Sequence, residues 1–120
     1  CNNLVSLLEI SKGMLVKAGV DVKKSGNPLD LLIKQTVTNY LSSGGQKALT
    51  GPVARGDVDT VASHLLALQS SPDGWQDAYR GLSKMAVEIS AKQGQASTEQ
   101  LQDILQLLNI DTNNQTGDNT

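Results

Sequence analysis

This sequence of 120 residues has few aromatic residues, one cysteine and no excess of positive charge. Its aromatic side chains are Trp75, Tyr40 and Tyr79, which are too few for a platform on which nucleic-acid bases stack. The chain has 10 Lys and Arg against 12 Asp and Glu, a net charge of -2. That balance gives no general attraction to nucleic acid or to acidic lipid. We therefore expect no nucleic-acid partner.

The only cysteine is Cys1, so one chain has neither an internal disulfide nor a cysteine-based metal cluster. No apolar run approaches the ~20 residues of a membrane span, and no signal peptide is visible. These absences predict a cytoplasmic protein with no metal site and no membrane partner. A lipidated Cys1 is a less favoured alternative, because an anchored protein needs a polar tether and here an apolar helical pattern starts at once.

What the sequence does contain is enough aliphatic residues for a core. About a quarter of the chain is Leu, Ile or Val, above the roughly 20% below which chains tend to stay disordered. The length favours one domain, which we expect to span residues 1–110. Residues 111–120 have no apolar side chain to bury, so we predict a disordered polar tail there.

Apolar residues at helical spacing predict two helices in the first part of the chain. The first ends near Gly19. The second has Asn27 as its N-cap and Pro28 as its first residue, where the missing N–H costs nothing, and it ends at residues 42–45. Their expected apolar faces are Leu4, Leu7, Leu8, Met14, Leu15 and Ala18 in the first, and Leu29, Leu32, Ile33, Val37, Tyr40 and Leu41 in the second.

Three further helices are expected after residue 57. Asp57 is a good N-cap for the third, Gly94 ends the fourth, and Ser97 with Gln100 fits a capping box for the fifth. Within the fourth, Gly81 is costly unless another helix packs closely on it. Their expected apolar faces are Val58, Val61, Ala62, Leu65 and Leu68, then Trp75, Ala78, Tyr79, Leu82, Met85, Ala86 and Ile89, then Leu101, Ile104, Leu105 and Leu108. The sequence therefore predicts an all-α bundle of about five helices.

Several apolar residues fall outside these faces, which indicates burial on more than one side of a helix. They are Val5, Ile10 and Val16 in the first helix, Leu31 in the second and Leu107 in the fifth. Two explanations stay open. The helices lie centrally in the bundle, or their second faces meet a further domain or a second copy of the chain.

Residues 50–57 form the least regular segment. Gly51, Pro52 and Gly56 are expected to exclude regular helix. Arg55 stands just before a helix N-terminus, where free N–H groups favour an anion. Thr50 adds a hydroxyl, and Gly51 lets backbone approach a ligand closely. The alternative is a purely structural corner.

No complete catalytic set is visible, and the catalytic residues stay unknown. His64 is the only histidine, and catalysis by histidine needs a positioned partner and a cleft. It lies beside the apolar face of the third helix, so we expect a surface or boundary residue. Lys84, Glu88 and Lys92 follow at steps of four and are expected on a solvated face.

Three stretches of the sequence resemble one bacterial family. They are NLVSLL at residues 3–8, ALTGPVARGD at residues 48–57 and VASHL at residues 61–65. Proteins of that family have an N-terminal Rossmann-like NADP-binding domain, followed by a helical domain catalogued as of unknown function. The helical domain is similar to the C-terminal domains of 6-phosphogluconate dehydrogenase and its relatives. The resemblance covers roughly residues 1–110.

This resemblance implies a 6-phosphogluconate dehydrogenase C-terminal-like fold, with Cys1 inside the opening helix and the Rossmann-like domain missing upstream. It implies that NADP or NAD is the cofactor of the intact protein. Asn3, Thr50, Gly51, Pro52 and Arg55 would face the cleft between the two domains. No particular substrate is implied. This chain lacks a glycine-rich phosphate loop, so alone it is expected to bind no dinucleotide tightly.

The function we expect is therefore that of a substrate-binding and dimerisation domain of an NAD(P)-dependent oxidoreductase, inactive alone. Its expected partners are its own Rossmann-like domain, a second copy and a small-molecule substrate. The alternative is a non-enzymatic helical module that binds another protein. Neither the choice between NAD and NADP nor the reaction direction follows from the sequence.

Overall fold

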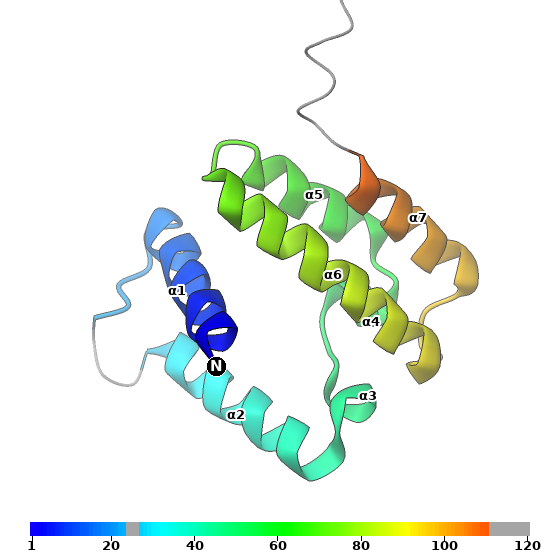
Figure 1. The fold of residues 1–120 in the computed structure, drawn as a ribbon, viewed down its shortest axis with the longest axis horizontal. Helices are drawn as coiled ribbons and strands as arrows, with labels where there is room; N and C mark the ends of the chain where they lie inside the picture. The colour runs from blue at the N-terminus through cyan, green and yellow to red at the C-terminus, as the bar shows by residue number, and fades with distance from the viewer. Residues whose placement is uncertain (24–26, 111–120) are drawn as a thin grey trace, which may run out of the picture. The chain divides into compact units, whose positions relative to one another are not determined.

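The computed structural model describes residues 1–23 and 27–110, and these residues are helical wherever they are regular (Figure 1). The described residues contain no strand, which confirms the all-α class. The predicted tail at residues 111–120 lies outside the described residues. The chain divides into two compact units, Cys1–Gly44 and Gly45–Thr120, and each is described by itself.

The first unit consists of α1 (Asn2–Lys17) and α2 (Pro28–Ser43). As predicted, α1 ends just before Gly19, whose positive φ of 88° suits glycine. Asn27 caps α2, because its side-chain oxygen accepts a hydrogen bond from the backbone N–H of Asp30 at 3.1 Å. Pro28 follows as the first helical residue, so this predicted helix start is also confirmed.

Neither α1 nor α2 has a buried residue. Large apolar side chains are exposed on both, with Leu41 at 78% and Leu31 at 69% of their accessible surface. Isolated helices of about this length are only marginally stable in water. The described residues of the first unit therefore form apolar faces and include no buried apolar side chain.

The second unit contains α3 (Gly45–Ala48), α4 (Pro52–Arg55), α5 (Val58–Leu68), α6 (Asp73–Gln93) and α7 (Thr98–Asn109). α6 packs against α4 and α7, and α5 packs against α7. This unit has a true core, formed by side chains from four of its helices. The core consists of Val53, Val61, Val87, Leu101, Ile104 and Leu108.

The expected number of about five helices corresponds to the five longer ones, and the described residues add the four-residue helices α3 and α4. The prediction that residues 50–57 exclude regular helix is wrong for α4. Gly51 (φ 96°) precedes this helix, Gly56 (φ 70°) ends it in the left-handed conformation, and Pro52 is its first residue. The three residues therefore bound one short helical turn, because a first-turn proline loses no hydrogen bond.

The caps predicted for the longer helices are confirmed. Asp57 accepts a hydrogen bond from the backbone N–H of Thr60 at 3.1 Å. Ser97 and Gln100 form the reciprocal capping box of α7, with distances of 2.9 and 3.1 Å. Gly94 ends α6 in the left-handed conformation.

The predicted inward face of α6 is wrong in part. The buried residues of α6 are Val87 and Ser90, whereas Leu82 and Met85 are 49% and 54% exposed. α6 turns Val87 and Ser90 toward the core because α4 and α7 lie on that side. The remaining stripe, which we call the α6 apolar stripe, has an exposed centre in this unit. It consists of Trp75, Ala78, Leu82, Met85 and Ile89.

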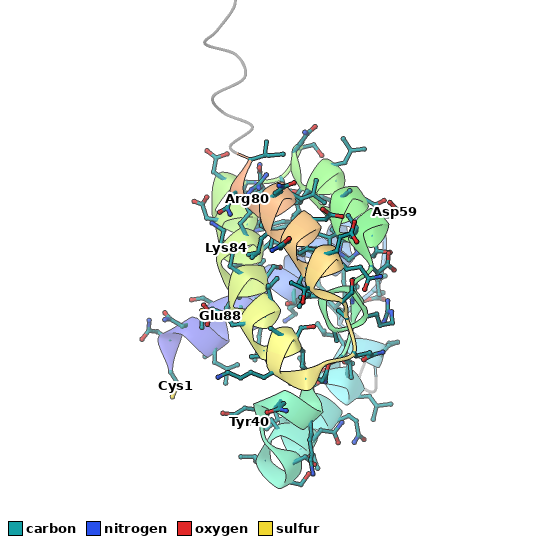
Figure 2. The ribbon with its side chains drawn as sticks, turned by 90° about the vertical axis from the view of Figure 1, so that its right-hand side faces the viewer. Cys1, Tyr40, Asp59, Arg80, Lys84 and Glu88 are labelled. Atoms are coloured by element: carbon teal, nitrogen blue, oxygen red, sulfur yellow. The ribbon has the colours of Figure 1, made fainter. Side chains whose placement is uncertain are left out.

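Two other expectations for α6 concern the packing at Gly81 and the exposure of its charged side chains. A Cβ atom placed on Gly81 would meet nothing within 4 Å, so the described residues do not pack closely on this glycine. Arg80, Lys84 and Glu88 follow one another along one side of α6 (Figure 2). Glu88 and Lys92 are exposed as predicted, and Lys84 is half-buried.

Candidate functional site

The segment at residues 50–57 is fixed to α6 by a buried hydrogen bond, and Leu49 just before it by a half-buried one. The Ser90 hydroxyl, with no exposed surface, donates to the backbone carbonyl oxygen of Val53 at 3.1 Å. Gln93 Nε2 donates to the carbonyl oxygen of Leu49 at 3.0 Å. Within the segment, the side chains of Val53 and Ala54 are buried. The loop therefore holds its exposed side chains on a rigid base.

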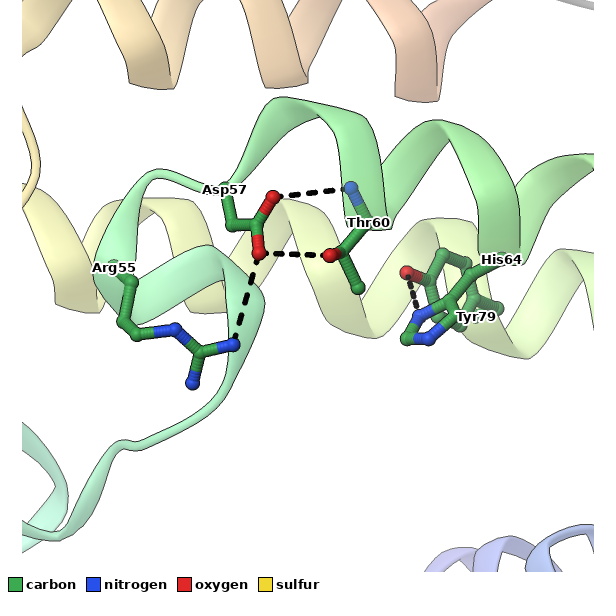
Figure 3. Close-up of polar contacts among 5 residues, drawn as sticks. All are labelled: Arg55, Asp57, Thr60, His64 and Tyr79. Carbon is green, nitrogen blue, oxygen red and sulfur yellow. Dashed lines mark hydrogen bonds and ion pairs between the residues drawn. The ribbon is translucent and has the colours of Figure 1, made fainter.

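Arg55 projects from this base into solvent. One guanidinium nitrogen lies 3.8 Å from an oxygen of Asp57, and the two side chains are 53% and 36% exposed (Figure 3). This is an ion pair beyond hydrogen-bond distance. Among the described residues, Arg55 makes no side-chain hydrogen bond. Its five N–H donors are therefore available to a ligand or to water.

Both carboxylate oxygens of Asp57 accept hydrogen bonds from Thr60. Its Oδ1 accepts from the Thr60 backbone N–H at 3.1 Å, and its Oδ2 accepts from the Thr60 hydroxyl at 2.7 Å. These two hydrogen bonds lower the pKa of Asp57 below its ordinary value, and the charges of Arg55 and His64 lower it further. Asp57 is thus an ionised carboxylate whose geometry is set by the first turn of α5.

His64 and Tyr79 join α5 to α6 on the same side of the unit. His64 Nδ1 lies 3.0 Å from the Tyr79 hydroxyl oxygen, and the two rings meet edge to face with centroids 5.8 Å apart at 84°. Burial raises the pKa of Tyr79, and a hydrogen bond from Ser83 offsets part of that rise. At neutral pH the Tyr79 hydroxyl therefore keeps its proton.

Arg55, Asp57, Thr60, His64 and Tyr79 lie along one side of the second unit (Figure 3). We call this set the Arg55–His64 face. Thr60 and His64 are four residues apart on α5, which places them on one side of the helix. The guanidinium of Arg55 and the imidazole of His64 thus lie on one open surface. Both groups can form hydrogen bonds with oxygen atoms of a ligand.

The predicted site residues fall into two places. Thr50 and Arg55 are exposed, Gly51 and Pro52 are half-buried, and all four lie in one segment of the second unit. Asn3 lies on α1 in the first unit, where it is exposed and its side-chain oxygen accepts from Asn2 at 2.9 Å. The roles proposed for these residues stay predictions.

Sequence reasoning missed Thr60 and the pairing of His64 with Tyr79. The four-residue spacing of Thr60 and His64 indicates that both lie on one side of a helix. The contact of His64 with Tyr79, in contrast, depends on how α5 packs on α6. The expectation that His64 is a surface or boundary residue is confirmed, since it is exposed.

A small hollow lies between α5, α6 and α7, next to Leu65, Arg80 and Leu107. Its volume of about 180 Å³ is below the roughly 300–1,000 Å³ of ordinary ligand pockets. Arg80 serves the fold there, because its Nη1 donates to the carbonyl oxygens of Leu107 and Leu108 at 3.0 and 2.9 Å. These carbonyls end α7, where such caps are needed.

Across residues 1–23 and 27–110, no cluster of three His, Cys, Asp or Glu side chains is placed to hold a metal ion. None of the helices in these ranges is long and apolar enough to cross a bilayer. A dinucleotide is held between a strand, a glycine-rich turn and a helix. These ranges contain no strand, so they do not form that cradle.

Comparison with known proteins identifies a family. Neither the curated proteins nor the solved structures gave a match. Residues 1–86 match the family described as "Domain of unknown function (DUF2520)". The matched range includes α1, α2 and every residue of the Arg55–His64 face. Because it covers 86 of the 120 residues, the chain belongs to the DUF2520 family.

Proposed function

We propose that this chain is the substrate-binding and dimerisation domain of an NAD(P)-dependent oxidoreductase. The observation that supports it best is the rigid segment at residues 50–57, because it presents Arg55 with unused donors beside a half-buried glycine and proline. The sequence of this segment is also the longest part of the resemblance noted above. The proposal includes a cytoplasmic location, in keeping with a single cysteine in the sequence.

In this function the chain's residues bind and orient a small molecule. Arg55 holds an anionic group, the Thr50 hydroxyl and the Asn3 amide hydrogen-bond to substrate oxygens, and Gly51 allows close approach of backbone. A Rossmann-like domain of the same protein holds NADP or NAD, which supplies the hydride chemistry. The fold type proposed for this chain is that of the 6-phosphogluconate dehydrogenase C-terminal domain.

The dimerisation part of the proposal is supported by exposed apolar side chains. The α6 apolar stripe has Leu82 and Met85 about half exposed, and α1 and α2 bury no residue. Contiguous exposed apolar surface on a small domain usually marks an interaction site. A second copy of the chain is the partner we propose for the α6 apolar stripe.

The oxidoreductase part is tested on the product of the complete native gene. Its mass is measured, and it is titrated with NADPH and with NADH while nicotinamide fluorescence is followed. Saturable binding of either cofactor supports the proposal, and absence of binding to the native product contradicts it. With a substrate in hand, Arg55→Ala is expected to raise KM, and Lys92→Ala, which removes an exposed charge elsewhere, is expected to leave KM unchanged.

The dimerisation part is tested by sedimentation of the chain itself. The double variant Leu82→Glu/Met85→Glu is expected to be a folded monomer with an unchanged far-ultraviolet circular dichroism spectrum, because neither side chain belongs to the core. Gln102→Glu adds charge at an exposed position of α7 and serves as the control. A monomeric wild-type chain would contradict dimerisation.

One alternative function is favoured by the same apolar surfaces, namely a non-enzymatic helical module that binds another protein. Exposed apolar faces on α1, α2 and α6 fit such a role without any substrate. The two proposals differ at Arg55. A native product that binds no nicotinamide cofactor, and that loses a protein partner when the α6 apolar stripe is charged, would favour the interaction module.

A further inference from the structure

We infer that the Arg55–His64 face is an oxyanion-binding site, in which the Arg55 guanidinium and the outward ring N–H of His64 hold a carboxylate or phosphate group of a small molecule. This inference depends on the proposed function only for the identity of that molecule as the enzyme's substrate. The inference adds His64 to the residues proposed to bind the substrate, and it gives Tyr79 the role of orienting the His64 ring.

The first part of the argument concerns Arg55. Its guanidinium is aimed by the fixed segment at residues 50–57 and by the 3.8 Å ion pair with Asp57. Asp57 does not consume its donors, because the closest guanidinium nitrogen and carboxylate oxygen are 3.8 Å apart, beyond hydrogen-bond distance. A guanidinium with free, directed N–H groups forms paired hydrogen bonds with the two oxygens of a carboxylate or phosphate.

The second part concerns the ring of His64. The Tyr79 hydroxyl oxygen and His64 Nδ1 lie 3.0 Å apart and form a hydrogen bond in which either group can be the donor. In a neutral imidazole one nitrogen accepts and the other has the proton. His64 Nε2 has no hydrogen-bond partner among the described residues, and it is a donor to an oxyanion whenever Nδ1 accepts from Tyr79 or both ring nitrogens have a proton. The edge-to-face contact with Tyr79 fixes the orientation of the ring.

The third part concerns the balance of charge. Asp57 is ionised and close to Arg55, so it offsets part of the attraction that Arg55 exerts on an anion. Both Arg55 and His64 are also exposed, where water competes for their donors and salt screens their charge. We therefore expect weak binding of an isolated oxyanion, with a dissociation constant on the order of 1 mM.

His64 provides an unambiguous reporter, because it is the only histidine in the sequence. The chain is titrated with inorganic phosphate and, separately, with malonate, at constant pH and ionic strength. Proton NMR follows the ring signals of His64. A saturable shift with either probe is expected. Saturation with phosphate alone identifies a phosphate site, and saturation with malonate alone identifies a carboxylate site.

Variants test whether the shift belongs to the proposed residues. Arg55→Gln is expected to weaken binding about tenfold, the loss expected for a charge-assisted hydrogen bond. Lys92→Gln removes the same charge at another exposed position and is expected to leave binding unchanged. His64→Gln, followed through backbone amide signals, is expected to weaken binding as well.

Two results would overturn the inference. One is the absence of a saturable shift with either probe up to about 50 mM, far above the expected dissociation constant. The other is equal weakening by Arg55→Gln and Lys92→Gln, which would show only general attraction. Because no nicotinamide is present, such a failure leaves the cofactor and dimerisation tests unaffected and removes only this face from the proposed function.

Discussion

Ser90 on α6 and Val53 on α4, 37 residues apart, are joined by a fully buried hydrogen bond of 3.1 Å from the serine hydroxyl to the backbone carbonyl oxygen. Val53 lies two residues before Arg55, so this bond fixes the segment that positions the guanidinium. The same carbonyl accepts the backbone N–H of Gly56 at 3.3 Å, which closes the turn of α4. One buried serine thus connects the packing of α6 to the geometry of the candidate site.

Replacing this serine is expected to destabilise the fold moderately. Ser90→Ala removes the donor but leaves the Val53 carbonyl its second bond to Gly56, so we expect a loss of about 1–2 kcal/mol in the free energy of unfolding. Urea denaturation followed by circular dichroism measures it. Ser63→Ala, at an exposed position of α5, is the control and is expected to change nothing. If Ser90→Ala has the same free energy of unfolding as the wild type, the hydrogen bond does not contribute to the stability of the fold.

Gly56 is expected to tolerate no side chain. Its φ of 70° is unfavourable for other residues, and a Cβ atom there would lie 2.5 Å from Gln100 Oε1 and 2.9 Å from the Cβ of Ala96. The Gln100 side chain belongs to the capping box of α7, so its displacement costs a cap as well. Gly56→Ala is expected to lose about 2–4 kcal/mol of unfolding free energy. A midpoint in urea equal to that of the wild type would contradict this.

Gly81 is expected to respond in the opposite direction. It lies inside α6, is exposed, and has open space where a Cβ would be placed. Gly81→Ala is therefore expected to stabilise the protein by about 0.5–1 kcal/mol, because alanine costs less conformational entropy in a helix. The thermal midpoint measured at low concentration checks this. Destabilisation would show that another body packs against this glycine.

Local signals in the sequence were enough to predict several boundaries of the longer helices, whereas the short helices α3 and α4 were missed. Asn27, Asp57, Ser97 and Gly94 act through hydrogen bonds or a backbone angle within about one helical turn, so their neighbours along the chain decide the outcome. Gly51 and Pro52 were misjudged because the same residues that interrupt a long helix also bound a short one.

The inward face of α6 was not predictable in the same way. Its apolar stripe is continuous in sequence, but α4 and α7 approach the side with Val87 and Ser90. A polar residue such as Ser90 is accepted in the core because its hydroxyl donates a hydrogen bond to the backbone carbonyl oxygen of Val53. That partner lies in a distant segment, so periodicity alone favoured the wrong side.

In the candidate site, too, some features follow from local sequence and others only from the packing of helices. Arg55 was found from its place before a helix, which is local information. The pairing of His64 with Tyr79 arises from the packing of α5 on α6 across 15 residues of sequence. No spacing rule connects those two positions, and so only the structure reveals that the histidine ring is oriented.

Asp57 links the candidate site to the pH dependence of folding. Its pKa in the folded protein is lowered from 3.8, chiefly by the hydroxyl and backbone hydrogen bonds of Thr60. A carboxyl group whose folded pKa is depressed stabilises the fold above its unfolded pKa. That contribution is lost as the pH falls from 3.8 through the lower folded value, because protonation of the folded state then becomes possible.

Asp57→Asn is therefore expected to separate the charge of this residue from its role as a cap. Asparagine also caps helices well, so the variant should fold with a thermal midpoint slightly below that of the wild type at pH 7. The difference is expected to shrink below pH 4 and to vanish once the wild-type carboxyl is protonated. Thermal unfolding from pH 2 to pH 7 measures it, with Asp59→Asn, an exposed neighbour, as the control. A difference that is constant over this range would show that the ionised form of Asp57 adds nothing to stability.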